Sequence, residues 1–419
     1  MDCDVCIVGG GSGGIGAAIG AARGGVSVIL IEKNHILGGT ITMAWVHSWE
    51  PTCKSSPLCR QLWNRMRIMP GGAANLDYEI GSSRLGPDGN RNPGLPFEPW
   101  AFLSAVDAEM KAAGIKQILY NTTFTSCKTD GASVKSIRVL GPSGAFEIKA
   151  KVFIDATADI HVARMAGCEV AKGAEAKSQY NEPHAPDGPN PKELNAMNWC
   201  YRVRVGSEPV KWPDLGPFPK EAIRPSRHEL RLPNGDIVVN PCGMVQADPG
   251  EPEEFARTIA RARYLAMEVH RWTVVVGGQS NRILIGLAPE IGVRETWRLV
   301  GRYVLTEQDV VGGLSSQKHP DLIAGSDHPL DIHGSIHVEL KQGYGIPFRC
   351  LQTKEYDNLL VSCRGSSFSH IAAGSCRLSR TMITIGEAAG AVAAAAIKKR
   401  KLADDIDAAK IHPLAEAGK

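Results

Sequence analysis

Three features that would point to other protein classes are missing from this 419-residue sequence. No stretch approaches 18 consecutive apolar residues, the length of a membrane span, so we expect no membrane segment. Neither charge dominates: 47 Lys and Arg against 44 Asp and Glu give a net charge of +3, which predicts no nucleic-acid or membrane partner. The 45 glycines follow no three-residue repeat, which excludes collagen. We therefore expect a large soluble protein with two interleaved domains.

A regular cysteine framework is also missing, because the 11 cysteines are odd in number and scattered. A chain of this length buries a core without disulfides, so we expect reduced, buried thiols. Cys3 and Cys6 form C-x-x-C, but within an apolar strand rather than at the helix start typical of a redox pair. No signal-peptide pattern precedes that strand, and the expected localisation is cytoplasmic.

The strongest pattern that is present lies in the first forty residues. Residues 4–8 form an apolar, β-branched run typical of a buried parallel strand, and the small residues of 13–23 predict a helix. A second strand is predicted over 26–31 and leads into Glu32. Between the first strand and the helix, three glycines spell G-x-G-x-x-G, namely Gly9, Gly11 and Gly14.

Each part of this pattern has a physical role in dinucleotide binding. The first glycine permits a tight turn, the second lets a pyrophosphate approach the backbone, and the third lets the helix pack closely. The helix N-terminus offers free N–H groups to phosphate. Glu32, 18 residues beyond Gly14, is placed to accept hydrogen bonds from a ribose diol. Because all parts occur in register, the sequence predicts a dinucleotide-binding domain.

The rest of the chain alternates less regularly. A simple NAD domain would continue with a third strand and helix, but residues 50–97 are irregular and rich in Pro, Gly and Asn, which favours inserted loops. A loop-rich stretch with scattered strands over 175–245 favours a β-rich substrate domain. Strands are predicted over 117–120, 134–140 and 146–153, the last two joined by the hairpin sequence GPSG. Helices are predicted over 99–113, 253–269, 292–303 and 381–398.

Four segments extend the argument beyond the glycine motif. They are VGGGSGGIGAA with IEKNHILGGT, then FIDATADIHVARMAG, then APEIGVRETWRLVGRYVLTEQDV, and finally DNLLVSCRGSSFSHIAAGSCRLSRTMITIGEAAGAVAA. In these segments the chain resembles the FAD-dependent oxidoreductase family related to the glutathione-reductase and fumarate-reductase flavoproteins. The resemblance is weakest over 42–97 and 175–225. It implies FAD as the cofactor and an α/β fold, in which an inserted α+β substrate domain interrupts a discontinuous Rossmann-like FAD-binding domain.

This resemblance also implies a domain order. The FAD-binding domain is expected in three parts, 1–41, 98–174 and 344–419. Between them we expect an insertion with active-site loops over 42–97, a substrate domain over 175–290 and a helical or loop connection over 291–343.

A set of FAD-binding residues follows from the same resemblance. The glycine turn would hold the pyrophosphate, Glu32 the adenosine ribose, and the strand near Phe124 the adenine through its backbone. Asp159 would reach the ribityl or phosphate region, and residues 374–382 would form the flavin-side loop and helix start. The full set is Gly9, Gly11, Ser12, Gly13, Gly14, Glu32, Lys33, Gly39, Thr40, Phe124, Ala156, Thr157, Asp159, Arg364, Gly374, Ser375, Arg377, Thr381 and Met382.

The sequence departs from the family pattern at two places. Ala158 stands where the A-T-G-D stretch usually has glycine, which puts the local backbone fit in question. Residues 240–244, NPCGM, stand where the family more often has a Thr-Arg pair, so the substrate contact usually made there is in question.

Three residues are the candidates for catalysis: His370, His47 and Arg294. His370 matches a family histidine before the last helix and would transfer a proton or contact substrate; alternatively it bonds loop backbone. His47 follows the second glycine loop and would contact substrate or link to flavin; alternatively it packs between two tryptophans. Arg294 would anchor a substrate anion, or pair with Glu290 four residues earlier. Arg377 would neutralise reduced flavin or bind pyrophosphate, or act as a structural bridge.

No metal site is predicted. His333 and His337 are four apart, but the glycine and β-branched residues between them disfavour the helix that would bring them together. No C-x-x-x-x-C follows the first glycine loop, which argues against a disulfide reductase. No second G-x-G-x-x-G appears, so a dedicated NAD(P)H site is not expected.

The predicted function is hydride transfer between a small organic substrate and N5 of FAD. Two alternatives stay open at this point: an NAD(P)-dependent Rossmann dehydrogenase, and a non-catalytic electron-transfer flavoprotein subunit. The identity of the substrate, the electron acceptor, and whether the chain forms a homo-oligomer are also open.

Overall fold

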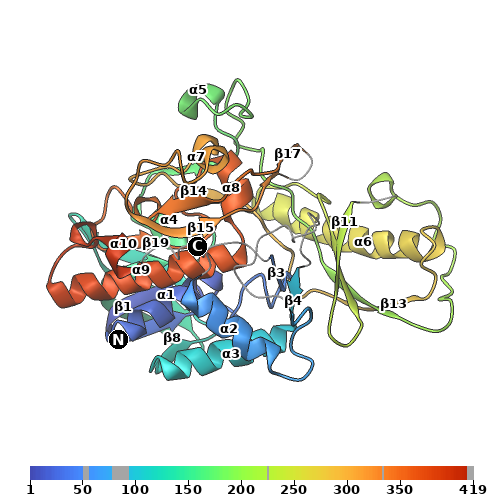
Figure 1. The fold of residues 1–419 in the computed structure, drawn as a ribbon, viewed down its shortest axis with the longest axis horizontal. Coiled ribbons are helices and arrows are strands. Elements are labelled where there is room, and N and C mark those ends of the chain that lie inside the picture. The colour runs from blue at the N-terminus through green and yellow to red at the C-terminus, as the bar shows by residue number, and fades with distance from the viewer. Residues whose placement is uncertain (51–55, 78–93, 224–225, 333–334, 413–419) are drawn as a thin grey trace.

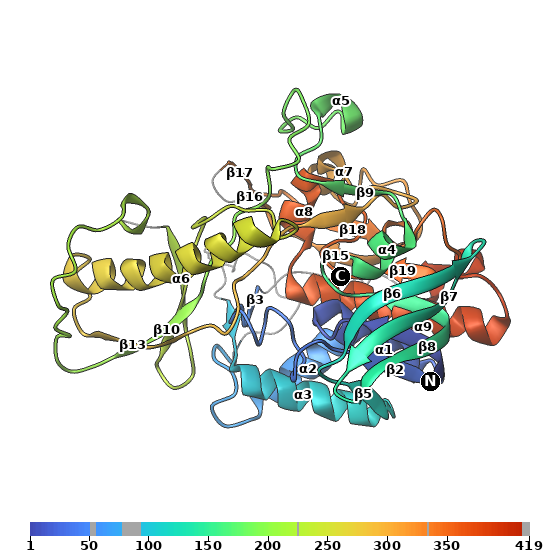
Figure 2. The ribbon, with the colours of Figure 1, turned by 180° about the vertical axis from the view of Figure 1, so that it is seen from behind.

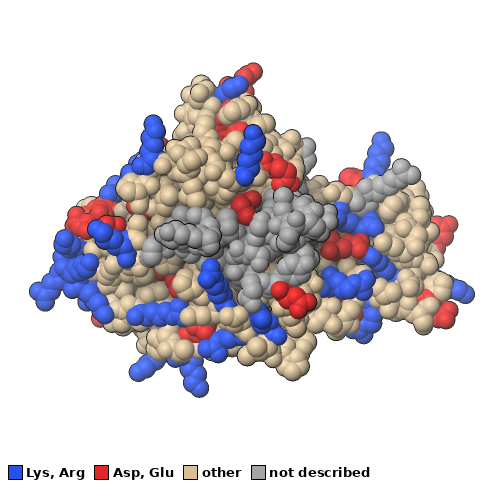
Figure 3. Space-filling view, viewed as in Figure 1, with Lys and Arg blue, Asp and Glu red and all other residues tan. Residues whose placement is uncertain are grey.

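The computed structural model describes residues 1–50, 56–77, 94–223, 226–332 and 335–412. These residues form a large main domain and a smaller lobe that projects from it (Figure 1). On the face shown in Figure 3, Lys and Arg side chains are scattered among Asp and Glu over both parts. Figure 2 shows the opposite side of the ribbon.

A seven-stranded sheet forms the centre of the main domain, with the order β5-β2-β1-β8-β7-β6 and with β19 also paired to β8. Five strands are parallel, namely β1 (Asp2–Val8), β2 (Val28–Ile31), β5 (Gln117–Leu119), β8 (Gly144–Asp155) and β19 (Leu359–Val361). Two are antiparallel neighbours, β6 (Thr123–Asp130) and β7 (Ser133–Gly141). Along one edge of β8, residues 144–149 pair with β7 and residues 153–155 pair with β19. One long strand therefore belongs to both the hairpin and the parallel sheet.

The alternating side chains of β1 enter two different cores. Val5 and Ile7 pack into the core under the helices, whereas Cys6 and Val8 pack into the core on the hairpin side. This alternation is what a strand covered on both faces requires. The long helices of the first core are α1 (Ser12–Arg23), α2 (Pro57–Arg67), α3 (Pro99–Ala112) and α9 (Ser379–Lys399).

Helices α1 and α9 cross at unusually short range because glycines line the contact. A Cβ added to Gly386 would stand 2.1 Å from the Gly13 oxygen, and one added to Gly390 would stand 2.0 Å from the Ala17 oxygen. On the other helix, a Cβ on Gly16 would stand 2.1 Å from the Ile383 oxygen. The helix of the first glycine motif and helix α9 are thus packed backbone to backbone.

Helix α9 is long and apolar enough, by length and composition, to cross a membrane. In this structure 78% of an apolar 18-residue stretch of the helix is buried inside the protein. That burial is typical of the core helix of a globular domain.

The lobe is an antiparallel sheet with one long helix. Its strand order is β11-β12-β10-β13, and apolar side chains of the sheet and helix form a third core. Its elements are β10 (Tyr201–Val205), β11 (Arg227–Arg231), β12 (Ile237–Pro241), α6 (Pro252–Val275) and β13 (Arg282–Leu287). An α+β unit, with its elements between residues 201 and 287, therefore interrupts the main domain.

The remaining elements are short. They are β3 (Ser48–Trp49), β4 (Leu95–Pro96), α4 (His161–Ala166), β9 (Val170–Lys172), α5 (Lys177–Tyr180), η1 (Lys220–Ala222), β14 (Trp297–Leu299), α7 (Glu307–Gly312), β15 (Leu322–Ser326), β16 (Leu330–Ile332), β17 (Ile336–Val338), β18 (Tyr344–Pro347), η2 (Phe348–Cys350), α8 (His370–Cys376), η3 (Ala403–Asp405) and α10 (Ala408–Ile411).

Two predictions of secondary structure are wrong. The helix predicted over 292–303 is extended, and its β14 pairs with β9, because Arg298 turns inward to the buried carboxylates of Glu175 and Glu295. Within the stretch predicted to be irregular, residues 57–67 form α2. Its start is encoded by Pro57 and by the Ser56 hydroxyl, which accepts from the Cys59 N–H.

Candidate active site

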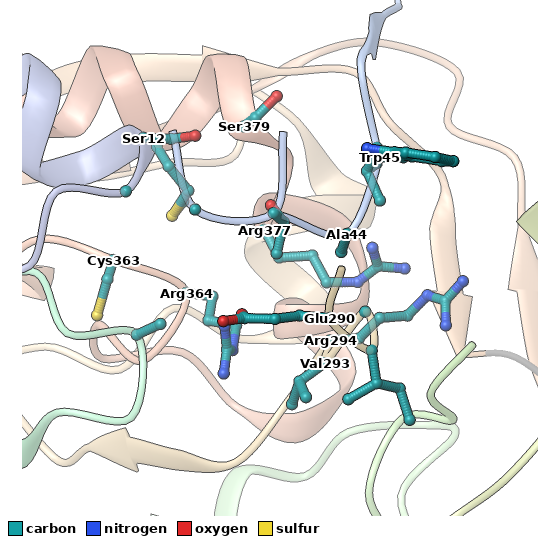
Figure 4. Close-up of a pocket in the computed structure, with 18 of the residues that line it drawn as sticks. Ser12, Ala44, Trp45, Glu290, Val293, Arg294, Cys363, Arg364, Arg377 and Ser379 are labelled. Carbon is teal, nitrogen blue, oxygen red and sulfur yellow. The ribbon is translucent and has the colours of Figure 1, made fainter. Parts of the chain in front are cut away.

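One cavity of about 1580 Å³ lies between the main domain and the lobe. Its wall begins at the carboxyl ends of β1 and β2, where open parallel sheets bind ligands, and continues onto β11, β12 and α6. The volume exceeds the roughly 300–1,000 Å³ of most ligand pockets, which leaves room for a dinucleotide and a substrate. Figure 4 shows part of the wall in close-up.

The turn between β1 and α1 closes one end of this cavity. Gly9 has a φ of +105°, and a Cβ there would stand 2.4 Å from the Ala156 oxygen. A Cβ on Gly14 would stand 1.8 Å from the Gly9 oxygen, so this glycine brings helix and turn together without lining the cavity. A Cβ on Gly11 would meet no atom within 4 Å, because this residue faces the cavity. The tight turn, open approach and close packing expected of the three glycines are all present.

The N-terminus of α1 is open toward the same space. Gly11, Ser12 and Gly13 line the cavity, and α1 has neither a side-chain cap nor an acidic residue in its first turn. The first N–H groups of a helix have no partner within the helix, and the helix dipole is positive there. This end of the cavity therefore suits an anion such as a pyrophosphate.

Glu32 lies beside the turn, with Lys33 next to it on the cavity wall. Its Oε2 accepts from the Gly10 N–H at 2.7 Å, and its Oε1 accepts from the Asn34 N–H at 2.8 Å. Burial raises the pKa of Glu32, and these backbone bonds partly offset that rise. The carboxylate thus fixes the turn as well as lining the site.

The A-T-A-D turn forms a second side of the same region, with Ala156, Thr157 and Asp159 on the cavity wall. Burial raises the pKa of Asp159, but the Arg364 guanidinium, 2.6 Å away, together with the Thr296 hydroxyl and nearby cations outweighs this effect, so the pKa is lowered. Ala158, where the family has glycine, has a φ of +69°, so the departure falls on a left-handed residue where glycine is favoured. Phe124 lies on the wall nearby, as do Gly39 and Thr40.

The segment predicted to meet the flavin divides into two groups. Arg377 and Met382 line the cavity, as does the uncapped start of α9. Gly374, Ser375 and Thr381 do not line it. Ser375 lies behind the wall because its hydroxyl bonds to the Tyr344 hydroxyl at 2.7 Å and to a backbone carbonyl of the neighbouring loop. Gly374, Ser375 and Thr381 therefore do not face the cavity, and Ser375 lies behind the residues that form its wall.

Neither histidine proposed for catalysis lines the cavity. His47 is buried with its Nδ1 2.5 Å from the Phe97 oxygen, and burial lowers its pKa to about 4. His370 is buried with its Nδ1 2.9 Å from both carboxylate oxygens of Glu295, which also pairs with Arg298. Both side chains are therefore held by the interior of the protein, and we no longer assign either to catalysis.

Arg294, the third candidate, does line the cavity, together with Arg377. In place of the ion pair expected with Glu290, Arg294 donates to the Ala196 carbonyl, while Glu290 accepts from the Asn34 amide at 3.4 Å. Burial and the nearby charge of Arg377 lower the pKa of Arg294 to about 10. Figure 4 shows the two guanidinium groups pointing to the same side. The pair forms a cationic part of the wall.

Comparison with known proteins decides the family. The chain matches the FAD dependent oxidoreductase family over residues 4–414. It belongs to that family. It is also 29% identical, over 293 residues, to the digeranylgeranylglycerophospholipid reductase of Methanothrix thermoacetophila, a match that covers 66% of each chain, just under two thirds.

One solved structure among those similar to this chain shows the same fold. A geranylgeranyl bacteriochlorophyll reductase-like protein from Thermoplasma acidophilum matches 98% of this chain and 82% of its own, with a TM-score of 0.50 and 15% identity. The L-proline dehydrogenase from P. horikoshii matches 99% of this chain and 97% of its own, with a TM-score of 0.44 and 13% identity. The predicted α/β FAD-binding fold, the FAD cofactor and the prediction of an oxidoreductase enzyme are confirmed. The NAD(P)-dependent and non-catalytic alternatives are set aside.

The cavity of this FAD-dependent oxidoreductase fits its cofactor. The Nε atoms of Arg364 and Arg377 are buried with no hydrogen-bond partner among the described residues, so the wall offers donors to an anionic or electron-rich ligand. The open start of α1 and the bare face of Gly11 add room and N–H groups for the pyrophosphate.

The wall residues that sequence reasoning missed include His328 and Glu50. His328 follows β15 directly, in a loop with no motif around it, and Glu50 is 278 residues away in the chain. The sequence signal near Glu50 was the stretch MAWVHSWEP, in which the prediction favoured His47 over Glu50. Of the two histidines considered as metal ligands, His337 is on the wall, whereas His333 lies outside the described residues.

Proposed function

We propose that this enzyme transfers a hydride between N5 of FAD and a small organic anion. The observation that carries the proposal is the pair Arg294 and Arg377 on the wall that the FAD-binding segments share with the lobe. When bound, FAD supplies the group that accepts or donates the hydride. The protein has to bind the substrate, orient its C–H bond and exclude water.

Charge supports an anionic ligand at this pair. The pKa of Arg294 is lowered, to about 10, by burial and then by Arg377, which means that two like charges share a poorly solvated region. Asp331, 3.5 Å from Arg377, offsets part of that charge. A carboxylate between the guanidiniums would relieve the repulsion and gain charge-assisted hydrogen bonds, which arginine makes in bidentate form.

A second candidate is the reduction of an isoprenoid lipid. It is favoured by the name of the Methanothrix relative, a reductase of a digeranylgeranylglycerophospholipid, and by the lining that the lobe contributes. Apolar side chains of the lobe extend the cavity beyond the arginines, namely Trp199, Leu230, Val238, Phe255 and Ile259. In this reading the arginines would hold a charged head group and the lobe an apolar chain.

The proposal is tested by binding of a simple anion. Oxalate, titrated into the purified yellow protein, should perturb the flavin absorbance with saturation. The substitution Arg294→Gln or Arg377→Gln should raise the Kd for oxalate about tenfold or more, because each removes a charge-assisted hydrogen bond. Arg138→Gln, which removes an exposed guanidinium from β7, is the matched control. Equal oxalate affinity in all four proteins would overturn the anion proposal, and reoxidation of reduced flavin by unsaturated isoprenoid lipids, with no reaction of small anions, would favour the second candidate.

A further inference from the structure

His328 occupies a distinctive position on the cavity wall. Its side chain is 10% exposed, and its Nδ1 lies 2.9 Å from Oε2 of Glu50, which also lines the cavity. Its Nε2 is buried and has no hydrogen-bond partner among the described residues. Buried polar atoms are nearly always paired, so an unpaired ring nitrogen at a cavity wall points to a ligand.

The loop that carries His328 is fixed at both of its backbone groups. Its N–H donates to the Ser326 hydroxyl at 3.2 Å, and its carbonyl accepts from the Ser375 hydroxyl at 2.5 Å. Ser375 belongs to α8, which leads directly into Arg377. The imidazole and the proposed anion site are therefore held by one rigid unit.

The contact with Glu50 sets the chemistry of the ring. A carboxylate only accepts hydrogen bonds, so Nδ1 must carry the proton that it shares with Glu50. In the neutral ring this leaves Nε2 with a lone pair. A histidine held by a carboxylate at one nitrogen and bare at the other is the arrangement of a general base with its positioning partner.

Other basic groups of the described wall are less suited to this role. The side chains of His161 and His337 are 53% and 56% exposed, and His337 lies between Asp331 and Glu339. Exposed imidazoles exchange protons with solvent rather than with a bound substrate. His328 is the buried imidazole of the described wall.

We infer that His328, positioned by Glu50, removes the hydroxyl proton from an organic anion that carries an alcohol. This inference rests on the proposed function and names its substrate class. The O–H proton would move to Nε2 of His328, the carbon-bound hydrogen would leave with its electron pair as a hydride that bound FAD would accept, and the C–O bond would become a carbonyl. The substrate would thus lose two electrons and two hydrogens, one hydrogen as a proton to His328 and the other with both electrons as the hydride.

The surroundings favour an alcohol over other hydride donors. A protonated amine would be repelled by the two guanidiniums of Arg294 and Arg377. A saturated acid without a hydroxyl offers only a C–H proton, which imidazole is too weak a base to remove. A hydroxyl next to a carboxylate matches both the base and the arginines.

The first test measures anaerobic reduction of the bound flavin by a panel of 2-hydroxy carboxylates, their amino counterparts and the parent acids without either group. Only hydroxy carboxylates should reduce it. His328→Gln should lower the reduction rate about 10²- to 10⁴-fold, with FAD content and oxalate Kd unchanged. The control variant His35→Gln, changed at an exposed histidine that does not line the cavity, should be reduced at the wild-type rate. Reduction by amines or unsubstituted acids alone, by no panel member, or by the His328 variant at full rate would overturn the inference.

The second test does not depend on turnover. In protein labelled with ¹⁵N-histidine, the His328 resonances, assigned by their loss in His328→Gln, should show a protonated Nδ1 and a bare Nε2. Glu50→Gln should disturb this tautomer, and Glu50→Asp should restore it in part. A protonated Nε2 in the wild type would overturn the base assignment, whereas unchanged oxalate binding in the arginine variants would overturn the anion site alone.

Discussion

At the scale of single residues, the buried imidazole of His270 makes the stability of the protein depend on pH. Its ring packs edge-on against Tyr201 and Trp212, and neither ring nitrogen has a hydrogen-bond partner among the described residues. Burial, together with the charge of Arg282, lowers its pKa to about 4. The folded protein therefore keeps this ring neutral at a pH where the unfolded chain would protonate it.

Stability should fall in mild acid for this reason. An unfolded histidine binds its proton near pH 6.5, so stability from His270 is fully present above that pH and is lost as the pH falls toward 4. At pH 5 the loss is about 2 kcal/mol. His270→Phe keeps the aromatic packing, and should lose about 2 kcal/mol less than the wild type between pH 7 and pH 5 in urea unfolding. Equal losses in the two proteins would contradict this account; His47, also lowered to about 4, contributes equally to both.

At the scale of elements, two glycines at the start of α1 have different roles: Gly11 leaves room for the cofactor, and Gly13 lets the helix pack closely. A methyl group on Gly11 would meet no protein atom, so Gly11→Ala should fold normally but weaken FAD binding about tenfold or more by intruding on the cavity. A methyl group on Gly13 would stand 1.9 Å from the Ser362 oxygen, so Gly13→Ala should destabilise the apoprotein by about 1–3 kcal/mol.

Thermal unfolding of the apoproteins and FAD titration distinguish these two effects. Gly188→Ala is the control, because its Cβ would also stand in open space but away from the cavity. Normal FAD affinity in Gly11→Ala would show that the cofactor does not approach this face.

The elements themselves were predictable where local patterns are strong. The helix over 253–269 and the hairpin around GPSG follow from periodicity and turn residues, and both are present as α6 and β7–β8. The extended structure around Arg298 could not be predicted in the same way. It depends on a buried ion pair with Glu175, more than a hundred residues earlier, and such a pair leaves no local sequence pattern.

The candidate site was predictable in the same uneven way. The glycine turn and Glu32 obey spacing rules that physics imposes on dinucleotide binding, so they were found from the sequence. His328 and Glu50 were not, because a side-chain pair joined only by the fold leaves no spacing to detect. His47 was chosen in their place because it is close in sequence to the cofactor loop, although its ring turns inward to Phe97.

At the scale of the whole molecule, Arg202 joins the lobe to the main domain. From β10 it donates two hydrogen bonds to Glu98, at 3.1 and 3.0 Å, and a third to the buried carboxylate of Asp236 at 2.8 Å. Glu98 stands at the start of α3, so this ion pair spans the two parts that enclose the cavity.

Removing this bridge should be costly. Arg202→Met should lower the free energy of unfolding by about 3 kcal/mol, because buried Glu98 and Asp236 both lose a partner. Arg204→Met is the matched control, since the more exposed Arg204 binds Asp236 but makes no contact with Glu98. Denaturant unfolding should therefore show the smaller loss for Arg204→Met, and equal losses would mean that the bridge contributes nothing between the lobe and the main domain.

The shared edge of β8 also has a consequence for the order in which the protein is made. Strand β8 completes its parallel pairing only with β19, and the glycines of α1 pack against those of α9, so early and late parts of the sequence must meet. Ribosomes extend a chain by about 5–20 residues per second, so the nascent β1–α1 unit waits tens of seconds for these partners. Until then its apolar surface is uncovered, so we expect the newly made chain to need chaperones for longer than a domain with local contacts would.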